Sequence, residues 1–179
     1  MMIVDKKILC VITARANSKG VVGKNYRDLM GKPLFIWSVL ASLNSKYVDY
    51  TLVSSNCKEI EKICLDKIMH DDLYSNLIFV KRPEEISGDF SKNEEALIHA
   101  YKWMEETNKE VEMIVNLQPT SPCRLNGLLN KCIKEYCNGG YNSLLTGSKN
   151  TPFMWQKING KWVYTVDKNG CCNRKMRQQ

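Results

Sequence analysis

The chain has 179 residues, of which 44% are hydrophobic and 25% charged, a composition typical of one globular domain that can bury its own core. Its formal net charge is +7, but the cations are scattered along the chain, which favours a small anionic substrate over nucleic acid. No apolar run approaches the ~20 residues of a membrane helix, and the run at 8–12 is too short for a signal peptide, so no membrane partner is expected.

The cysteines indicate a reducing compartment rather than a metal site or a disulfide framework. The sequence has eight cysteines and two histidines, and no pair of cysteines is spaced as Cys-x-x-Cys, so we expect no zinc site. A chain with a core of its own has little need of disulfides. We therefore expect reduced thiols in a cytoplasmic protein, with Cys10 and Cys64 filling the core.

Hydrophobic periodicity predicts strands and helices that alternate along the chain. The expected strands lie at 7–14, 50–54, 77–80, 111–117 and 143–147. The expected helices lie at about 33–43, 57–68, 92–106 and 125–137. Asn56 is the expected N-cap of the second helix, and the glycines at 139 and 140 should end the fourth.

The last segment, about 151–166, predicts a β-hairpin, because Asn159-Gly160 is a preferred turn between two short strands. The alternation that precedes it predicts an α/β fold, with a three-layer architecture in which helices cover both faces of a mostly parallel sheet. No linker or internal repeat interrupts the pattern, so a single domain over 1–179 is expected.

A cationic loop follows the first expected strand. It contains Arg15, Lys19 and Lys24 together with Gly20 and Gly23. Glycines let a backbone approach phosphates closely and fixed cations offset their charge, so this loop predicts a polyphosphate site. It is neither a Walker loop nor the dinucleotide fingerprint. The alternative is that the cations merely solvate a charged turn.

A second loop, Gln118 to Arg124, follows the expected strand at 111–117. Ligands of open α/β sheets bind beyond the carboxyl ends of the strands, so the two loops together predict a nucleotide cleft. Thr120 and Ser121 would offer hydroxyls and backbone donors to a substrate. The loop also reads as a rigid turn in which Ser121 is the N-cap of the next helix and Pro122 its first residue.

Three motifs resemble those of one family. The segment Ala14–Asn25 (Ala-Arg-Ala-Asn-Ser-Lys-Gly-Val-Val-Gly-Lys-Asn) resembles the first signature of the acylneuraminate cytidylyltransferases, the CMP-sialic acid synthetases. The segment Leu117–Arg124 resembles their Leu-Gln-Pro-Thr-Ser-Pro-x-Arg, and Lys81-Arg82-Pro83 followed by Gly88-Asp89 is a weaker third match. The resemblance runs from about residue 8 to the last residue and implies a nucleotide-diphospho-sugar transferase-like fold.

The resemblance also implies a reaction, in which a cytidylyltransferase activates a nine-carbon 2-keto sugar acid with CTP to give the CMP-sugar and pyrophosphate. It implies that the CTP phosphates are bound by Arg15, Ser18, Lys19 and Lys24, with Arg15, Lys19 and Lys24 as the catalytic charge stabilisers. Asn25 would contact the ribose and Arg82 the cytosine. The acidic sugar would be bound by Gln118, Thr120, Ser121 and Arg124.

Two departures from the family limit what is implied. Relatives continue past residue 179 into a dimerisation strand and a late Asp-x-Asp that holds Mg²⁺. Magnesium is therefore expected as cofactor without assigned ligands, a homodimer is expected where the C-terminal segment is present, and the activity of a truncated chain is uncertain. Asn56 stands where many relatives carry Asp.

Two other functions remain open at this point. One is a 3-deoxy-manno-octulosonate cytidylyltransferase or another sugar nucleotidyltransferase. The other is a catalytically inactive nucleotide-binding remnant.

Overall fold

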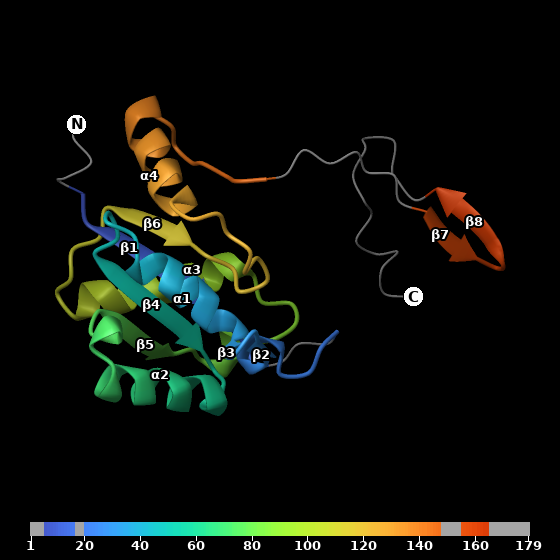
Figure 1. Ribbon diagram of the computed structural model, residues 1–179, viewed down its shortest axis with the longest axis horizontal. Helices are drawn as coiled ribbons and strands as arrows, with labels where there is room; N and C mark the ends of the chain where they lie inside the picture. Colours follow the sequence, from blue (N-terminus) through green and yellow to red (C-terminus); the bar gives the residue numbers. More distant parts are fainter. Residues whose placement is uncertain (1–5, 17–19, 148–154, 165–179) are drawn as a thin grey trace. The chain divides into compact units, whose positions relative to one another are not determined.

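The computed structural model describes residues 6–16, 20–147 and 155–164. The chain divides into two units, Met1–Leu144 and Leu145–Gln179 (Figure 1). The first unit carries the sheet and the helices, and the second carries a hairpin.

A four-stranded sheet forms the centre of the first unit, with strand order β5-β4-β1-β6. Its strands are β1 (Ile8–Thr13), β4 (Tyr50–Ser55), β5 (Leu77–Lys81) and β6 (Met113–Asn116). All three pairings in this sheet are parallel. The continuous apolar run of β1 is buried because β1 has a strand on each side and helices on both faces.

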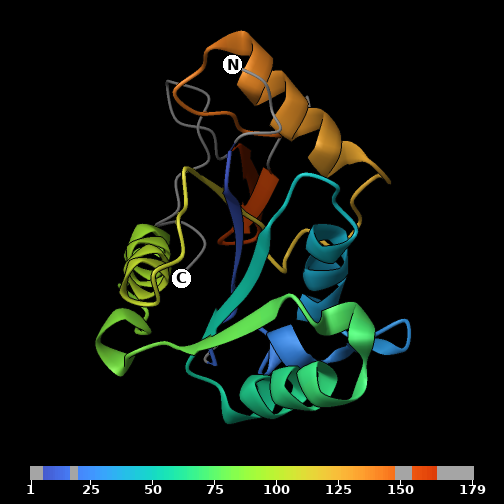
Figure 2. The same cartoon turned by 90° about the vertical axis from the view of Figure 1, so that its left-hand side faces the viewer.

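Four helices cover the two faces of this sheet: α1 (Leu34–Leu43), α2 (Lys58–His70), α3 (Asn93–Glu106) and α4 (Leu128–Gly139). Cys10 and Ile12 of β1 pack with Phe35 of α1 on one face, where α2 also lies. Leu9 and Val11 point to the opposite face and pack against α3. Figure 2 shows α3 on one side of the strands and α1 and α2 on the other. The predicted three-layer, parallel α/β fold is confirmed.

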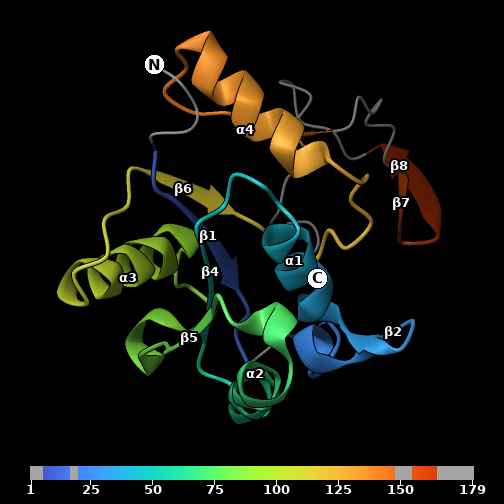
Figure 3. The same cartoon turned by 60° about the vertical axis from the view of Figure 1, so that its left-hand side comes forward.

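The fourth helix extends the layer that contains α1. Ile133 of α4 packs on Ile8 and Met113 at the amino ends of β1 and β6. Figure 3 shows α4 beside β6. The helix ends at Gly140, whose φ of 62° is in the left-handed region, as the sequence predicts.

The core thiols are where the sequence places them. Cys10 and Cys64 are both fully buried in the cluster between the sheet and the helices α1 and α2. Burial raises the pKa of each thiol to about 12, so both stay protonated and act as small apolar side chains.

Several short elements between the main strands and helices are not detected by a periodicity analysis. A small antiparallel hairpin joins β2 (Asp28–Leu29) to β3 (Lys32–Pro33). Single 3₁₀ turns form at η2 (Lys24–Tyr26), η3 (Asp72–Tyr74) and η4 (Glu84–Ile86). Elements of two or three residues are too short for a hydrophobic repeat to show.

Three local predictions are wrong. Residues 143–147 form no strand, because they pair with no other part of the described chain and Leu145 is 94% exposed. Helix α4 begins at Leu128 after Gly127, so Ser121 and Pro122 do not start it. The N-cap of α2 is Cys57 rather than Asn56, whose side chain is engaged elsewhere.

The second unit contains the expected hairpin. Strands β7 (Trp155–Ile158) and β8 (Lys161–Tyr164) pair antiparallel. Asn159 and Gly160 have φ values of 51° and 80°, the two left-handed residues of a tight hairpin turn. The outer ends of the predicted segment, 151–154 and 165–166, lie outside the described residues.

Candidate functional site

The candidate site lies where the strands of the sheet end. Because all the strand pairs are parallel, the residues that follow β1, β4, β5 and β6 come to the same edge. Those positions are occupied by Arg15, Asn56, Arg82 and Gln118, respectively. The sequence predicts that the first and second loops share an edge, and the topology confirms this.

Arg15 links the first motif to the third. Its Nη1 donates a hydrogen bond of 2.8 Å to the carbonyl of Gly88 and lies 3.4 Å from Oδ1 of Asp89. The side chains of the ion pair are 36% and 37% exposed, so water screens their attraction. Arg15 is therefore held at this edge of the sheet by exposed contacts that an anionic ligand can replace.

Arg82 is the most unusual side chain of the site. It is 6% exposed, and neither Nε nor Nη2 has a hydrogen-bond partner among the described residues. Burial lowers the pKa of its guanidinium, the charge of Arg15 lowers it further, and the Glu84 carboxylate opposes both. A buried cation with unpaired donors destabilises the fold. Such an arrangement is typical of a group that binds a ligand through the acceptor atoms of that ligand.

The backbone around Arg15 is fixed by Asn25. The Asn25 side chain is 7% exposed and its Nδ2 donates a 2.9 Å hydrogen bond to the carbonyl of Arg15. Asn25 lies with Lys24 on η2, which begins after Gly23. Gly23 has φ +66°, and a Cβ there would lie 2.5 Å from the Tyr26 ring. The positive φ therefore favours glycine at this position, where η2 begins.

Two predicted phosphate ligands, Ser18 and Lys19, lie outside the described residues. Lys24 is half-buried on η2. The predicted contacts of Asn25 with ribose, of Arg82 with cytosine and of the first-loop cations with phosphates stay predictions.

Within the second loop, Arg124 anchors the backbone. Its Nη2 donates to the carbonyl of Gln118 at 2.7 Å, and its Nη1 donates to Oγ of Ser38 on α1 at 2.9 Å. The side chains of Gln118, Thr120 and Ser121 are exposed at the same edge. These contacts also explain the late start of α4, because they hold the chain in an irregular turn up to Arg124.

Asn56 and Glu84 belong to the site although the sequence analysis gave them no part in it. The Asn56 side chain contacts both Ala16 of the first loop and Glu84 after β5. The sequence signal that could have found Asn56 was its position, because it directly follows the buried strand β4, while Arg15 lies two residues after the end of β1.

The described residues do not fit a Mg²⁺ site. They contain no group of three or more His, Cys, Asp or Glu side chains that could hold a metal ion. Of the carboxylates around Arg15 and Arg82, Glu84 accepts from Asn56 and Asp89 pairs with Arg15. No step is therefore assigned to a metal.

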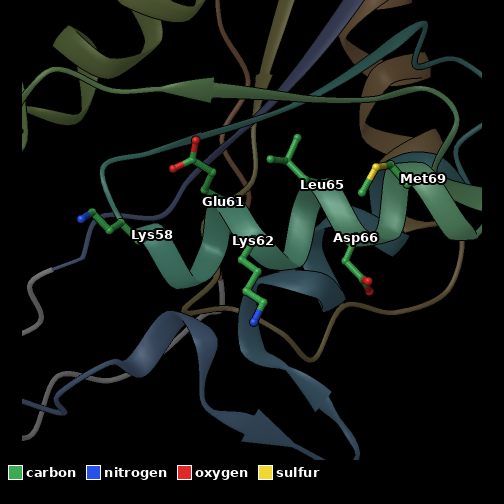
Figure 4. Close-up of a pocket in the computed structure, with 6 residues that line it drawn as sticks. All are labelled: Lys58, Glu61, Lys62, Leu65, Asp66 and Met69. Atoms are coloured by element: carbon green, nitrogen blue, oxygen red, sulfur yellow. The ribbon is translucent and has the colours of Figure 1, made fainter.

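A pocket along α2 is separate from this edge. It is lined by Lys58, Glu61, Lys62, Leu65, Asp66 and Met69, all from that helix (Figure 4). None of them is a predicted site residue, so this pocket adds nothing to the candidate site. No helix in the described part of the chain is long and apolar enough to pass through a bilayer.

Comparison with known proteins identifies the family. The family model described as Cytidylyltransferase matches residues 9–164, which include both signature loops and the segment after β5. The chain belongs to the cytidylyltransferase family.

Curated relatives within this family carry names that agree with the resemblance of the motifs. An N-acylneuraminate cytidylyltransferase of Oncorhynchus mykiss is 30% identical over 97% of this chain and 38% of its own length. A CMP-N,N'-diacetyllegionaminic acid synthase of Legionella pneumophila is 32% identical over 92% of this chain and 65% of its own length. This chain thus spans less than two thirds of the length of each of these two relatives.

Solved structures support the fold of this chain. A 4-diphosphocytidyl-2C-methyl-D-erythritol synthase has a TM-score of 0.64 at 18% identity, over 93% of this chain and 71% of that one. A CMP:2-keto-3-deoxy-manno-octonic acid synthetase complexed with CTP has a TM-score of 0.58 at 18% identity, over 75% of this chain and 48% of that one. The predicted nucleotide-diphospho-sugar transferase-like fold is confirmed.

Proposed function

We propose that this chain transfers CMP from CTP to a nine-carbon 2-keto sugar acid of the sialic acid type and releases pyrophosphate. The single observation that carries the proposal is Arg82, a buried guanidinium with two unpaired donors at the edge where the three signature motifs meet. Membership of the cytidylyltransferase family and relatives named for acylneuraminate and legionaminate substrates support the choice of nucleotide and acceptor.

The nucleotide is proposed to bind between Arg82 and the first loop. Cytosine presents a ring nitrogen and a carbonyl oxygen as neighbouring acceptors, which suit the two free N–H groups of Arg82. The triphosphate would lie against Arg15 and Lys24, together with Ser18 and Lys19. Burial is the larger cause of the lowered pKa of Arg82, and the negative charge of the triphosphate would relieve the second cause, which is repulsion from Arg15.

The sugar acid is proposed to bind at the second loop. Gln118 is the expected contact, with Thr120 and Ser121 beside it, and these side chains are exposed at the sheet edge. Arg124 is half-buried and bound to Gln118 and Ser38, so its first role is to hold this loop.

In the proposed reaction the anomeric hydroxyl of the sugar attacks the α-phosphorus of CTP in line, and the bond to pyrophosphate breaks. Such a transfer depends on alignment and on stabilisation of charge more than on covalent help from the protein. Arg15, Lys19 and Lys24 are the proposed charge stabilisers for the leaving group. The described residues present no group placed to act as general base.

The cofactor and the assembly stay predictions from the resemblance. Mg²⁺ would supply further neutralisation of phosphate charge. A homodimer and a cytoplasmic location are proposed on the same ground.

The decisive experiment measures pyrophosphate release from CTP and Mg²⁺ with a panel of sugar acids. The panel contains acylneuraminic, legionaminic and pseudaminic acids, with 3-deoxy-manno-octulosonate as the competing acceptor. We expect release with a nine-carbon acid and none with the eight-carbon one. Turnover with the eight-carbon acid alone would mean that this acid is the acceptor in place of the proposed one. CTP binding without pyrophosphate release in the presence of any of the acids would indicate a nucleotide-binding remnant.

A further inference from the structure

The Asn56 side chain joins two loops that begin on different strands. Its Oδ1 accepts a 2.9 Å hydrogen bond from the backbone N–H of Ala16, in the first loop. Its Nδ2 donates to both carboxylate oxygens of Glu84, at 3.2 and 3.0 Å. The Asn56 amide therefore accepts a hydrogen bond from the first loop and donates hydrogen bonds to the segment after β5.

The neighbouring residue holds the same loop one step earlier. Ser55 Oγ donates to the carbonyl of Ala14 at 2.5 Å and accepts from the backbone N–H of Cys57 at 3.0 Å. Ser55 and Asn56, at the end of β4, thus hydrogen-bond the first loop at Ala14 and at Ala16, on either side of Arg15. Together with the Asn25 contact to the Arg15 carbonyl, this fixes the backbone from which the Arg15 side chain extends.

The other partner of Asn56 is tied to the buried arginine. Glu84 begins η4, two residues after Arg82. Its carboxylate raises the pKa of Arg82 against the larger effects of burial and of the Arg15 charge. Asn56 therefore couples the position of Arg15 to the position and the counter-charge of Arg82.

We propose that Asn56 is a positioning residue of the nucleotide site, which sets the relative placement of Arg15 and Arg82 through its bridge between Ala16 and Glu84. This inference rests on the proposed CTP site. As long as position 84 carries a carboxylate, the bridge needs an amide at position 56, because an amide has an acceptor and a donor on one short side chain.

The chain offers a matched set of substitutions for this bridge. Asn56→Asp keeps the acceptor for Ala16 but brings two carboxylates into contact at the Glu84 end, which pushes the loops apart or raises the pKa of one acid. Glu84→Gln leaves an oxygen that can still accept from Asn56. The double variant Asn56→Asp/Glu84→Gln keeps the acceptor for Ala16 and restores the contact between residues 56 and 84 with donor and acceptor exchanged, and its net charge equals that of the wild type.

Calorimetric titration of CTP into the full chain tests the proposal. We expect Asn56→Asp to weaken CTP binding about tenfold, the scale of one lost hydrogen bond to a charged group, and the double variant to return to within about threefold of wild type. The CTP affinity of the single variant Glu84→Gln should also lie within about threefold of wild type. An Asn56→Asp variant that binds CTP as wild type does, or a double variant no better than Asn56→Asp, would overturn the proposal.

Amide hydrogen exchange in the free protein, followed by NMR, separates this inference from the proposed function. We expect the Ala16 amide to exchange faster in Asn56→Asp and to regain its protection in the double variant. If the wild type fails to bind CTP, the proposed function fails, and unchanged Ala16 exchange in Asn56→Asp would then reject the bridge independently. A variant that loses thermal stability while its CTP affinity is unchanged would mean that Asn56 is only structural, which also rejects the proposal.

Discussion

Arg82 carries an energetic penalty that the fold alone does not offset. A guanidinium that is 6% exposed leaves Nε and Nη2 without partners, whereas most buried polar groups in folded proteins are paired. Glu84 compensates its charge only in part, since burial and Arg15 together lower the pKa of Arg82. In the proposed site, Arg82 would therefore contribute to ligand binding at the expense of stability.

This conflict predicts opposite effects of one substitution. Arg82→Met fills the same space without unpaired donors, so it should raise the free energy of unfolding by about 1–3 kcal/mol. It should also erode the preference for CTP over other nucleoside triphosphates. Urea unfolding and competitive calorimetry measure the two effects, with the exposed neighbour Lys81→Met as control. A less stable Arg82→Met would show that the guanidinium supports the fold.

Lys24 is predicted to act on the triphosphate. It is half-buried on η2, next to the Asn25 that holds Arg15. Lys24→Ala should weaken CTP binding by about 1–3 kcal/mol, the scale for a hydrogen bond to a charged group. The exposed Lys102 of α3 is the control, and Lys102→Ala should bind CTP as wild type does. Equal affinities for both variants would remove η2 from the site.

The sugar acid loop is predicted to act separately from the nucleotide. Gln118 is exposed, and its carbonyl, not its side chain, is the acceptor for Arg124. Gln118→Ala should therefore leave the loop and CTP affinity intact and raise the KM for the sugar acid. Steady-state kinetics with each substrate varied in turn measures this. Loss of CTP affinity in Gln118→Ala would contradict the proposed division of the site.

At the scale of elements, short irregular segments rather than helices position the site. The turn η2, the end of β4 and the turn η4 place Asn25, Asn56 and Glu84. The helices and the sheet provide the rigid base: β1 is buried between β4 and β6 and cannot shift without disrupting two parallel pairings.

Three glycines of this region separate two causes of strain. An added Cβ would meet open space at Gly20, which has no positive φ, and also at Gly31, which has φ +82°. At Gly23, which has φ +66°, an added Cβ would also clash with the Tyr26 ring. Replacement by Ala should be neutral at Gly20, destabilising by about 1 kcal/mol at Gly31 and more at Gly23. Thermal unfolding of the three variants checks this order. A Gly23→Ala variant as stable as Gly20→Ala would mean that η2 adapts freely.

At the scale of the whole molecule, every described residue of the candidate site lies in the unit Met1–Leu144. We predict that a chain ending at Leu144 folds and binds CTP within about twofold of the full chain, because the contacts that fix Arg15, Arg82 and Gln118 are internal to that unit. Calorimetry and circular dichroism test this. Loss of cooperative unfolding in the shorter chain would favour the single domain over 1–179 that the sequence predicts.

The sequence alone determined the elements whose signals are local. The apolar run of β1, the helical repeats of α1 to α3 and the Asn159-Gly160 turn each depend on burial or backbone preference within a few residues. The cations and glycines of the first loop indicated a polyphosphate site. The resemblance of the three motifs implied a cytidylyltransferase, and the family match agrees with it.

Only the tertiary structure decided how the loops contact one another. Asn56 is expected from its neighbours to cap a helix, yet its amide bridges Ala16 and Glu84, 40 and 28 residues away in sequence. Arg124 matches a substrate motif, yet it folds back onto Gln118 and Ser38. Such contacts depend on which strands are neighbours and where each strand ends, and a periodic pattern within one segment contains no information about its neighbours in space.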